Sequence, residues 1–203
     1  MNRDRIVLVG TGLAATALAA LLGLAGCGSA PSATAPAGAV AADAPSSGAA
    51  LPQRPRSVPV DGIDACAVIT SPLRLELGVS SRMDRNPAGD GLASSDCEWT
   101  NFPAEPGLAL FVRLVRNQGV DAYLGQPGAQ LTTVSGFGAV ELPGQLANPD
   151  EGCVVRVDVA SRQSLWVGYT SDGPIPGRTH SEMCARARTA SASVLAQLLA
   201  RVR

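Results

Sequence analysis

The stretch CVVRVDVASRQSLWVGY, residues 153–169, decides the fold. Apolar side chains occupy every second position of its first half, at Cys153, Val155, Val157 and Val159. Arg156 and Asp158 lie between them, which is the period-two pattern of a strand with one buried face. The alternation resumes at Leu165, Val167 and Tyr169. We therefore predict an antiparallel hairpin with its turn at residues 160–163.

Further strands are predicted on the N-terminal side of this hairpin. Residues 108–115 place Leu108, Leu110, Val112 and Leu114 on one face, opposite Arg113. Cys97 and Trp99 also share a face. Residues 131–134 and 139–142 flank the sequence Ser-Gly-Phe-Gly, which is typical of a turn between two short strands. Together these segments predict an antiparallel sheet.

Two helices are predicted at the ends of the domain. Thr179 and Glu182 have capping-box spacing, and apolar residues recur at helical spacing from Cys184 to Val202. Ser71 followed by Pro72 begins the other helix, and a third, short helix is expected at residues 121–124. The chain is therefore expected to have an α+β fold, in which an antiparallel β-sheet packs against an N-terminal and a C-terminal α-helix.

Residues 1–26 have the pattern of an export signal. A short cationic segment precedes an Ala/Leu-rich apolar run, which ends in Leu-Ala-Gly-Cys at Cys27. This tetrad matches the bacterial lipobox, in which the cysteine is acylated and becomes the mature N-terminus. The alternative is an uncleaved membrane helix, for which the run is long enough. The tetrad favours a lipoprotein on the extracytoplasmic face of the cell membrane, with its lipid chains as the membrane contact.

Residues 27–56 are rich in Ala, Ser, Pro and Gly and contain almost no bulky apolar side chain. Such a segment buries too little surface to offset the entropy of ordering it. We expect a flexible tether that is dispensable for folding, followed by a single extracytoplasmic domain at residues 57–203.

The mature domain contains an even number of cysteines: Cys66, Cys97, Cys153 and Cys184. In an exported chain this count indicates two disulfides. Three pairings are possible. Cys66 with Cys97 and Cys153 with Cys184 is the favoured one, because each bond then closes a short loop.

Four short motifs, taken in order, resemble the actinomycete envelope lipoproteins that are classified only as a domain of unknown function (type 3558). They are Asp64-x-Cys66, Cys97-x-Trp99, Cys153-x-Val155-x-Val157 and the Cys184 that opens the last helix. The chain departs from that family at Ala65, where Pro is usual, and at Arg74, where a capping acid is common. The resemblance implies an extracytoplasmic, disulfide-bonded, non-catalytic domain, and it supplies no site residues.

The sequence lacks the sets of residues that several catalytic and metal-binding sites require. The one histidine, His180, is expected at an exposed helix start and has no triad partners. Glu98, Glu105 and Glu141 have no glycosidase spacing, and the Asp84–Asp90 segment lacks most positions of a calcium loop. No catalytic residue, cofactor or metal is expected, and no Arg-rich run suggests nucleic acid.

Two function classes survive. The first is a non-catalytic binding or accessory module at the cell envelope, which recognises an envelope protein, glycan or lipid. The second is a carrier of envelope lipids or other hydrophobic ligands in an internal cavity. A cavity above about 300 Å³ between sheet and helices would favour the carrier, and a filled core would favour the module.

Overall fold

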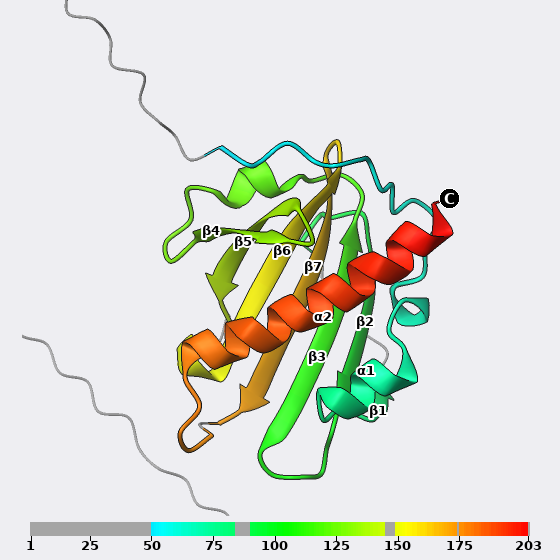
Figure 1. Cartoon of the computed structure of the whole chain (residues 1–203). Coiled ribbons are helices and arrows are strands. Elements are labelled where there is room, and N and C mark those ends of the chain that lie inside the picture. The colour runs from blue at the N-terminus through cyan, green and yellow to red at the C-terminus, as the bar shows by residue number, and fades with distance from the viewer. Residues whose placement is uncertain (1–49, 84–89, 145–148, 174, 203) are drawn as a thin grey trace, which may run out of the picture. The chain divides into compact units, whose positions relative to one another are not determined.

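The computed structural model describes residues 50–83, 90–144, 149–173 and 175–202. Within these ranges seven antiparallel strands form one sheet in the order β1-β2-β3-β7-β6-β5-β4 (Figure 1). The strands are β1 (Ser81–Met83), β2 (Ser94–Thr100), β3 (Gly107–Val115), β4 (Gln130–Val134), β5 (Phe137–Pro143), β6 (Gly152–Ala160) and β7 (Gln163–Asp172). The predicted antiparallel α+β architecture is confirmed.

The predicted hairpin is formed by β6 and β7, which lie next to each other inside the sheet. Their register pairs Val155 with Val167 and continues to Ala160 opposite Gln163, so that only two residues form the tip. Every residue of β6 is buried. The hairpin is thus covered on both faces, although its alternating pattern predicted one buried face and one exposed face.

One face of the sheet is covered by the long helix α2 (His180–Arg201), which crosses it diagonally (Figure 1). We call this the front face. Thr179 begins the helix with the predicted capping box, since its hydroxyl accepts from the Glu182 N–H and the Glu182 carboxylate accepts from the Thr179 N–H. Aliphatic side chains of α2 and of the five inner strands fill the front-face core, including Val155, Val157, Leu165, Val167, Leu195 and Leu198.

The N-terminal helix is much smaller than the expected fold requires. Helix α1 (Ser71–Glu76) begins at the predicted Ser-Pro pair and has six residues, of which only Leu73 is buried. Gly78 follows with a φ of +74°, a left-handed conformation that ends the helix. The predicted packing of an N-terminal helix on the sheet is therefore not confirmed. Beside α2, the front face is covered mainly by the irregular segments around α1, which bury Val58, Val68, Ile69 and Val79 in the core. Three short 3₁₀ turns complete the elements: η1 (Ala65–Ala67), η2 (Val120–Tyr123) and η3 (Pro149–Glu151).

Both disulfides have the favoured pairing. Cys66–Cys97 joins η1 to β2, with Cα atoms 5.1 Å apart. Cys153–Cys184 joins β6 to the second turn of α2, with Cα atoms 4.9 Å apart. Each bond therefore connects a helical element to the sheet.

Residues 51–60, which we call the strap, lie along the outer end of the β6–β7 hairpin (Figure 1). The Val58 N–H donates to the Val159 carbonyl at 2.7 Å, and Val58 and Val60 are buried in the front-face core. Gln163 accepts from the Val60 N–H at 2.9 Å.

The first half of the strap crosses to the opposite face of the sheet, which we call the back face. Arg54 donates to both carboxylate oxygens of Asp158, at 2.6 and 2.7 Å, and Leu51 packs against the apolar residues there. The sequence assigned residues 51–56 to a dispensable tether, whereas these contacts tie them to the domain. The amino-acid composition of this segment did not indicate these contacts, because a single arginine is enough to form the ion pair with Asp158.

The two disulfides provide a matched comparison, since each spans a sequence separation of 31 residues. In the chain-entropy model, loops of this length give equal stabilisation of about 3–4 kcal/mol. We expect Cys66→Ala/Cys97→Ala and Cys153→Ala/Cys184→Ala to lower the free energy of unfolding by this amount each, as measured in denaturant. A double variant that unfolds like the wild type would contradict the expectation.

Arg54→Ala should lower the free energy of unfolding by about 1–3 kcal/mol, because it leaves the Asp158 carboxylate without its partner. Burial raises the pKa of Asp158, and the bond from Arg54 opposes that rise. The folded state therefore disfavours the charged carboxylate, so the loss should be largest at neutral pH and should shrink in acid, where Asp158 is protonated. Thermal unfolding of the wild type and of Arg54→Ala, compared from neutral to acidic pH, measures this loss.

Arg56→Ala is the matched control, because Arg56 is exposed and makes one long bond, at 3.3 Å, to the Leu199 carbonyl. Its effect should stay within about 0.5 kcal/mol. Equal losses for both variants, or a loss from Arg54→Ala that does not depend on pH, would show that the ion pair does not hold the strap.

Candidate functional site

The back face carries charged residues in the middle of the sheet. The register places Asp96 of β2, Arg113 of β3, Trp166 of β7 and Arg156 of β6 in one row across four neighbouring strands. Side chains that are directly opposite in an antiparallel pair share a face and contact each other. The two arginines therefore lie on either side of Trp166. This row is the base of the candidate site.

Arg113 is fully paired. Its Nε and Nη2 donate to the two carboxylate oxygens of Asp96 at 3.0 and 2.8 Å, and its Nη1 donates to Asp90. Burial alone would lower the pKa of Arg113, but the hydrogen bonds that it donates to Asp96 and Asp90 outweigh burial and raise that pKa. Two acids thus neutralise this buried cation.

Arg156 has no such partner. It exposes 7 % of its surface, and its Nε and Nη1 atoms have no hydrogen-bond partner among the described residues. Its guanidinium carbon lies 3.6 Å from the centre of the Tyr123 ring and 4.0 Å from the centre of the Trp166 ring. Burial, opposed in part by Tyr123 and assisted by the neighbouring charge of Arg113, lowers the pKa of Arg156 to about 10. The guanidinium is therefore a buried cation that is stabilised by aromatic rings rather than by acids.

The side chains around Arg156 form a pocket of about 520 Å³ on the back face. Strand residues form its base, and residues of the two flanking loops, including Leu92, Gln118, Tyr123 and Gln126, form its walls. Phe111 lies directly over Gly168, where an added Cβ would come within 1.8 Å of the ring. Only glycine at position 168 lets this ring lie against the sheet beside Trp166. The volume is in the range of small-ligand sites.

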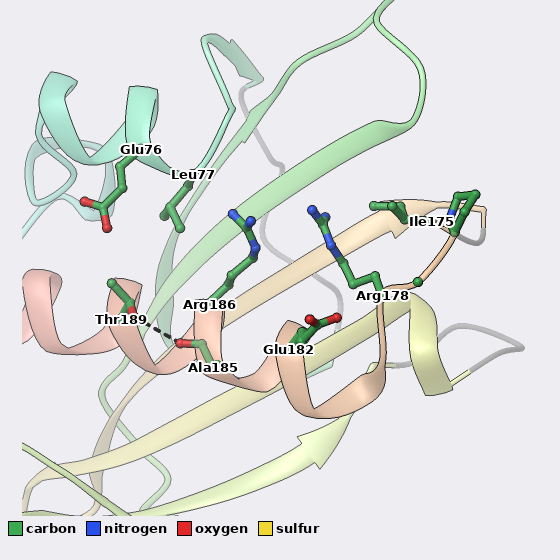
Figure 2. Close-up of a pocket in the computed structure, with 10 residues that line it drawn as sticks. Glu76, Leu77, Ile175, Arg178, Glu182, Ala185, Arg186 and Thr189 are labelled. Atoms are coloured by element: carbon green, nitrogen blue, oxygen red, sulfur yellow. Dashed lines mark hydrogen bonds between the residues drawn. The ribbon is translucent and has the colours of Figure 1, made fainter.

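A second pocket, of about 650 Å³, lies where the segment before α2 passes α1. Arg178, Glu182 and Arg186 project from the C-terminal segment, and Glu76 from α1 (Figure 2). Like the back-face pocket, it contains two acids and two arginines, and the Glu182 carboxylate already accepts the capping hydrogen bond of α2. Arg178 has one buried nitrogen, Nη1, without a hydrogen-bond partner among the described residues, whereas Arg156 of the back-face pocket has two.

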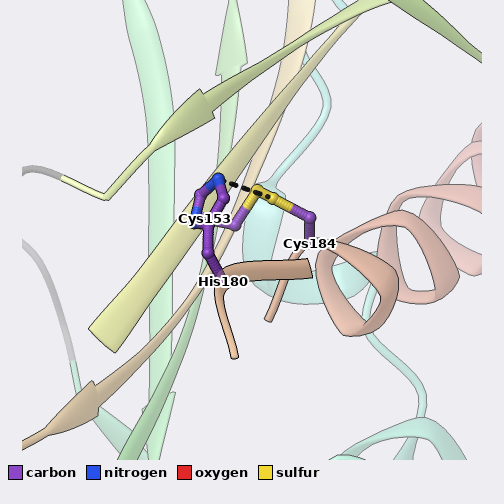
Figure 3. Close-up of side chains that lie close together, drawn as sticks. All are labelled: Cys153, His180 and Cys184. Atoms are coloured by element: carbon purple, nitrogen blue, oxygen red, sulfur yellow. Dashed lines mark hydrogen bonds between the residues drawn. A yellow bond between two sulfur atoms is a disulfide. The ribbon is translucent and has the colours of Figure 1, made fainter. Parts of the chain in front are cut away.

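Cys153, His180 and Cys184 bring potential metal ligands within 4.8 Å of one another (Figure 3). The two sulfurs are joined in a disulfide, and His180 Nε2 lies 3.5 Å from the Cys184 sulfur. Metals bind cysteine as the thiolate, so this group cannot act as a metal site while the bond is intact. His180 is half-buried against the disulfide, which corrects the prediction that it is exposed.

The remaining residues singled out in the sequence are dispersed. Glu141 is buried and accepts from Arg188 at 2.6 Å. Of the segment that weakly resembles a calcium loop, residues 84–89 lie outside the described residues, and Asp90 binds Arg113. Cys27 lies outside the described residues as well.

Sequence reasoning missed Arg156 as a site residue. It recognised that Arg156 shares a face with Asp158 but assigned that face to solvent. A signal was present: Trp166 and Val154 belong to the same face, and aromatic residues are unusual on a fully solvated one.

A family model described as "Protein of unknown function (DUF3558)" matches residues 22–197 of the chain. The matched range includes Cys27, all four disulfide cysteines and the whole back-face row. The searches of curated proteins and of solved structures find no match. Among the described residues, no helix has the length and apolar character needed to cross a membrane.

The two arginines beside Trp166 should respond in opposite ways to the same substitution. Arg113→Met leaves Asp96 buried without its cation and should lower the free energy of unfolding by about 3–5 kcal/mol. Arg156→Met replaces an unpaired buried cation with an apolar chain that suits aromatic neighbours, and should raise it by about 1 kcal/mol. Denaturant unfolding measures both. If both variants are destabilised equally, Arg156 is a structural residue like Arg113.

Proposed function

The chain belongs to the DUF3558 family of proteins of unknown function, and we propose that it is a lipid-anchored, non-catalytic binding module of the cell envelope. The observation that carries this proposal is the back-face pocket, in which Arg156 is held without an acidic partner. The pocket binds the ligand, and the lipid on Cys27 keeps the domain at the outer side of the membrane.

Two independent features support the extracytoplasmic location. The first is the lipobox at Cys27, which follows a cationic and then an apolar segment. The second is the pair of disulfides, since such bonds persist in oxidising compartments and are rare in the cytosol. Two or more acyl chains give stable membrane attachment, so the domain itself needs no membrane-binding surface.

The filling of the front-face core favours a binding module over a lipid carrier. Side chains of α2 and the sheet occupy the layer in which a carrier would need its cavity. The pocket lies on the other face and is lined by charged and neutral polar side chains as well as by apolar ones. An acyl chain needs a dry apolar cavity, whereas this lining suits a ligand with a polar group.

The chemistry of the pocket favours binding over catalysis. Its two acids, Asp90 and Asp96, both accept hydrogen bonds from Arg113. A backbone hydrogen bond from Leu92 contributes most to lowering the pKa of Asp90, so this carboxyl stays ionised and bound. Arginine does not give up its proton near neutral pH. The charged groups of the pocket can therefore position a ligand but are poorly suited to move protons.

Native mass spectrometry of the full mature chain, extracted in detergent from its own host, tests the binding function. We expect a protein species heavier than the lipidated polypeptide by one small molecule. Only the lipidated mass, together with turnover of an envelope compound by the same preparation, would contradict a non-catalytic module.

The anchor has its own test. Cys27→Ala should abolish lipid labelling and release the chain from the membrane fraction, because the lipobox offers no other acylation site. Gly26→Ala is the matched control, since it keeps a small residue before the cysteine and should leave labelling unchanged. Retention of unlabelled Cys27→Ala protein in the membrane would contradict the lipid anchor.

A further inference from the structure

We propose that the back-face pocket binds a small organic anion, whose carboxylate or phosphate group is held by Arg156 and whose apolar part lies against Phe111 and Val154. This inference deepens the proposed binding function and rests on it. It adds the chemical class of the ligand and names the residue that selects it.

The first argument is the unmet bonding capacity of Arg156. A guanidinium has five N–H groups, and carboxylates and phosphates are the partners that match its geometry. Here Nε and Nη1 are buried without an acceptor among the described residues, in a side chain that exposes 7 % of its surface. The charge has left water without gaining a counterion. Because Nε and Nη1 are closed off from solvent, an anion in the pocket supplies the missing charge from the pocket side of the guanidinium, and hydrogen bonds to these two atoms require a shift of the side chain.

The second argument is the charge of the surroundings. The two acids that line the pocket are both engaged by Arg113, on the far side of Trp166. Among the ionisable groups of the described residues, Arg113 acts on Arg156 as a like charge, and the phenol of Tyr123 favours the charged guanidinium. Near Arg156 the pocket therefore attracts anions and repels cations.

The third argument is the shape of the lining. The pocket of about 520 Å³ is large enough for one or two rings or a short acyl segment beside the anionic group. Phe111 and Val154 provide an apolar wall next to Arg156, and Gln118, Gln126 and Thr170 provide neutral polar groups. Because Gly168 leaves room for the Phe111 ring, the wall lies flat against the sheet. These features fit a compact amphiphilic anion better than inorganic phosphate.

Four probes of similar size and different charge test the proposal: benzoate, phenyl phosphate, benzamide and benzylamine. Binding to the full mature chain in detergent is followed by tryptophan fluorescence, because Trp166 lines the pocket whereas Trp99 is buried in the front-face core. We expect benzoate or phenyl phosphate to bind at least tenfold more tightly than benzamide and benzylamine, and to raise the midpoint of thermal unfolding.

Arg156→Met should lose this preference, with at least a tenfold weaker affinity for the anions, while its unfolding midpoint without ligand is no lower than that of the wild type. Arg186→Met is the matched control. Arg186 also lies near an aromatic ring, 5.7 Å from the centre of Tyr169, but it belongs to the second pocket. It should bind the anions like the wild type.

The source of the anion is resolved by vesicles. If Cys27→Ala protein floats with phosphatidylglycerol vesicles but not with phosphatidylcholine vesicles, and does so only when Arg156 is present, the anion is a lipid headgroup. Binding to the soluble anions alone identifies a free small molecule. Both results support the proposal.

Four results would overturn it. If benzamide binds as tightly as benzoate, charge does not determine binding. If Arg156→Met binds the anions with unchanged affinity, Arg156 does not hold them. If a co-purified ligand persists in Arg156→Met, the anion assignment fails and the binding function stands. If no probe binds and no ligand is found on the wild type, both fail.

Discussion

Strand β6 lies inside the sheet with all of its residues buried, so the fold depends on covering both faces of the β6–β7 hairpin. The front face is covered by the helix that the sequence encodes most clearly. The back face has no helix of comparable length among the described elements, and its cover comes from η2, the neighbouring loops and the strap. Loops cover a sheet less completely than a helix does, and the gap they leave is the pocket beside Arg156.

The covalent and ionic ties of the domain match this division. The Cys153–Cys184 bond fixes the start of α2 to β6, and Cys66–Cys97 fixes η1 to β2. On the back face the corresponding contacts are ion pairs, Arg54 with Asp158 and Arg113 with Asp90 and Asp96, whereas the front face has the Arg188–Glu141 ion pair in addition to its disulfides. Ion pairs respond to pH and salt, and disulfides do not. The front face is therefore held by covalent bonds, and the proposed ligand pocket lies on the face whose described contacts are noncovalent.

Much of the fold could be predicted from the sequence because its signals are local. The alternation of apolar and polar residues predicted the central hairpin and β3. The spacing of Thr179 and Glu182 predicted the start of α2, and the even number of cysteines predicted two disulfides. Helix α1 begins at the predicted Ser-Pro pair, but its contribution to the cover of the sheet was overestimated, because its six residues bury only Leu73. The site could not be predicted in the same way. Alternation shows which residues share a face, but it does not show that Tyr123 and Leu92, from separate loops, come to cover it.

The contrast between the two arginines shows that the fold does not force Arg156 to be unpaired. Both lie in the same row, both are buried, and both lie near Trp166. Arg113 has an acid directly opposite it on the next strand, whereas the neighbour of Arg156 on β5 is Val140. An acid at that position would neutralise the cation, and an apolar residue in place of Arg156 would remove the cost of burying it. The chain has neither solution, and a buried charge kept without a partner is the type of departure from optimal packing that proteins retain for function. Under the proposed function, the stability of the domain and its binding chemistry are linked, because the group that weakens the folded state without ligand is also the group proposed to hold the ligand.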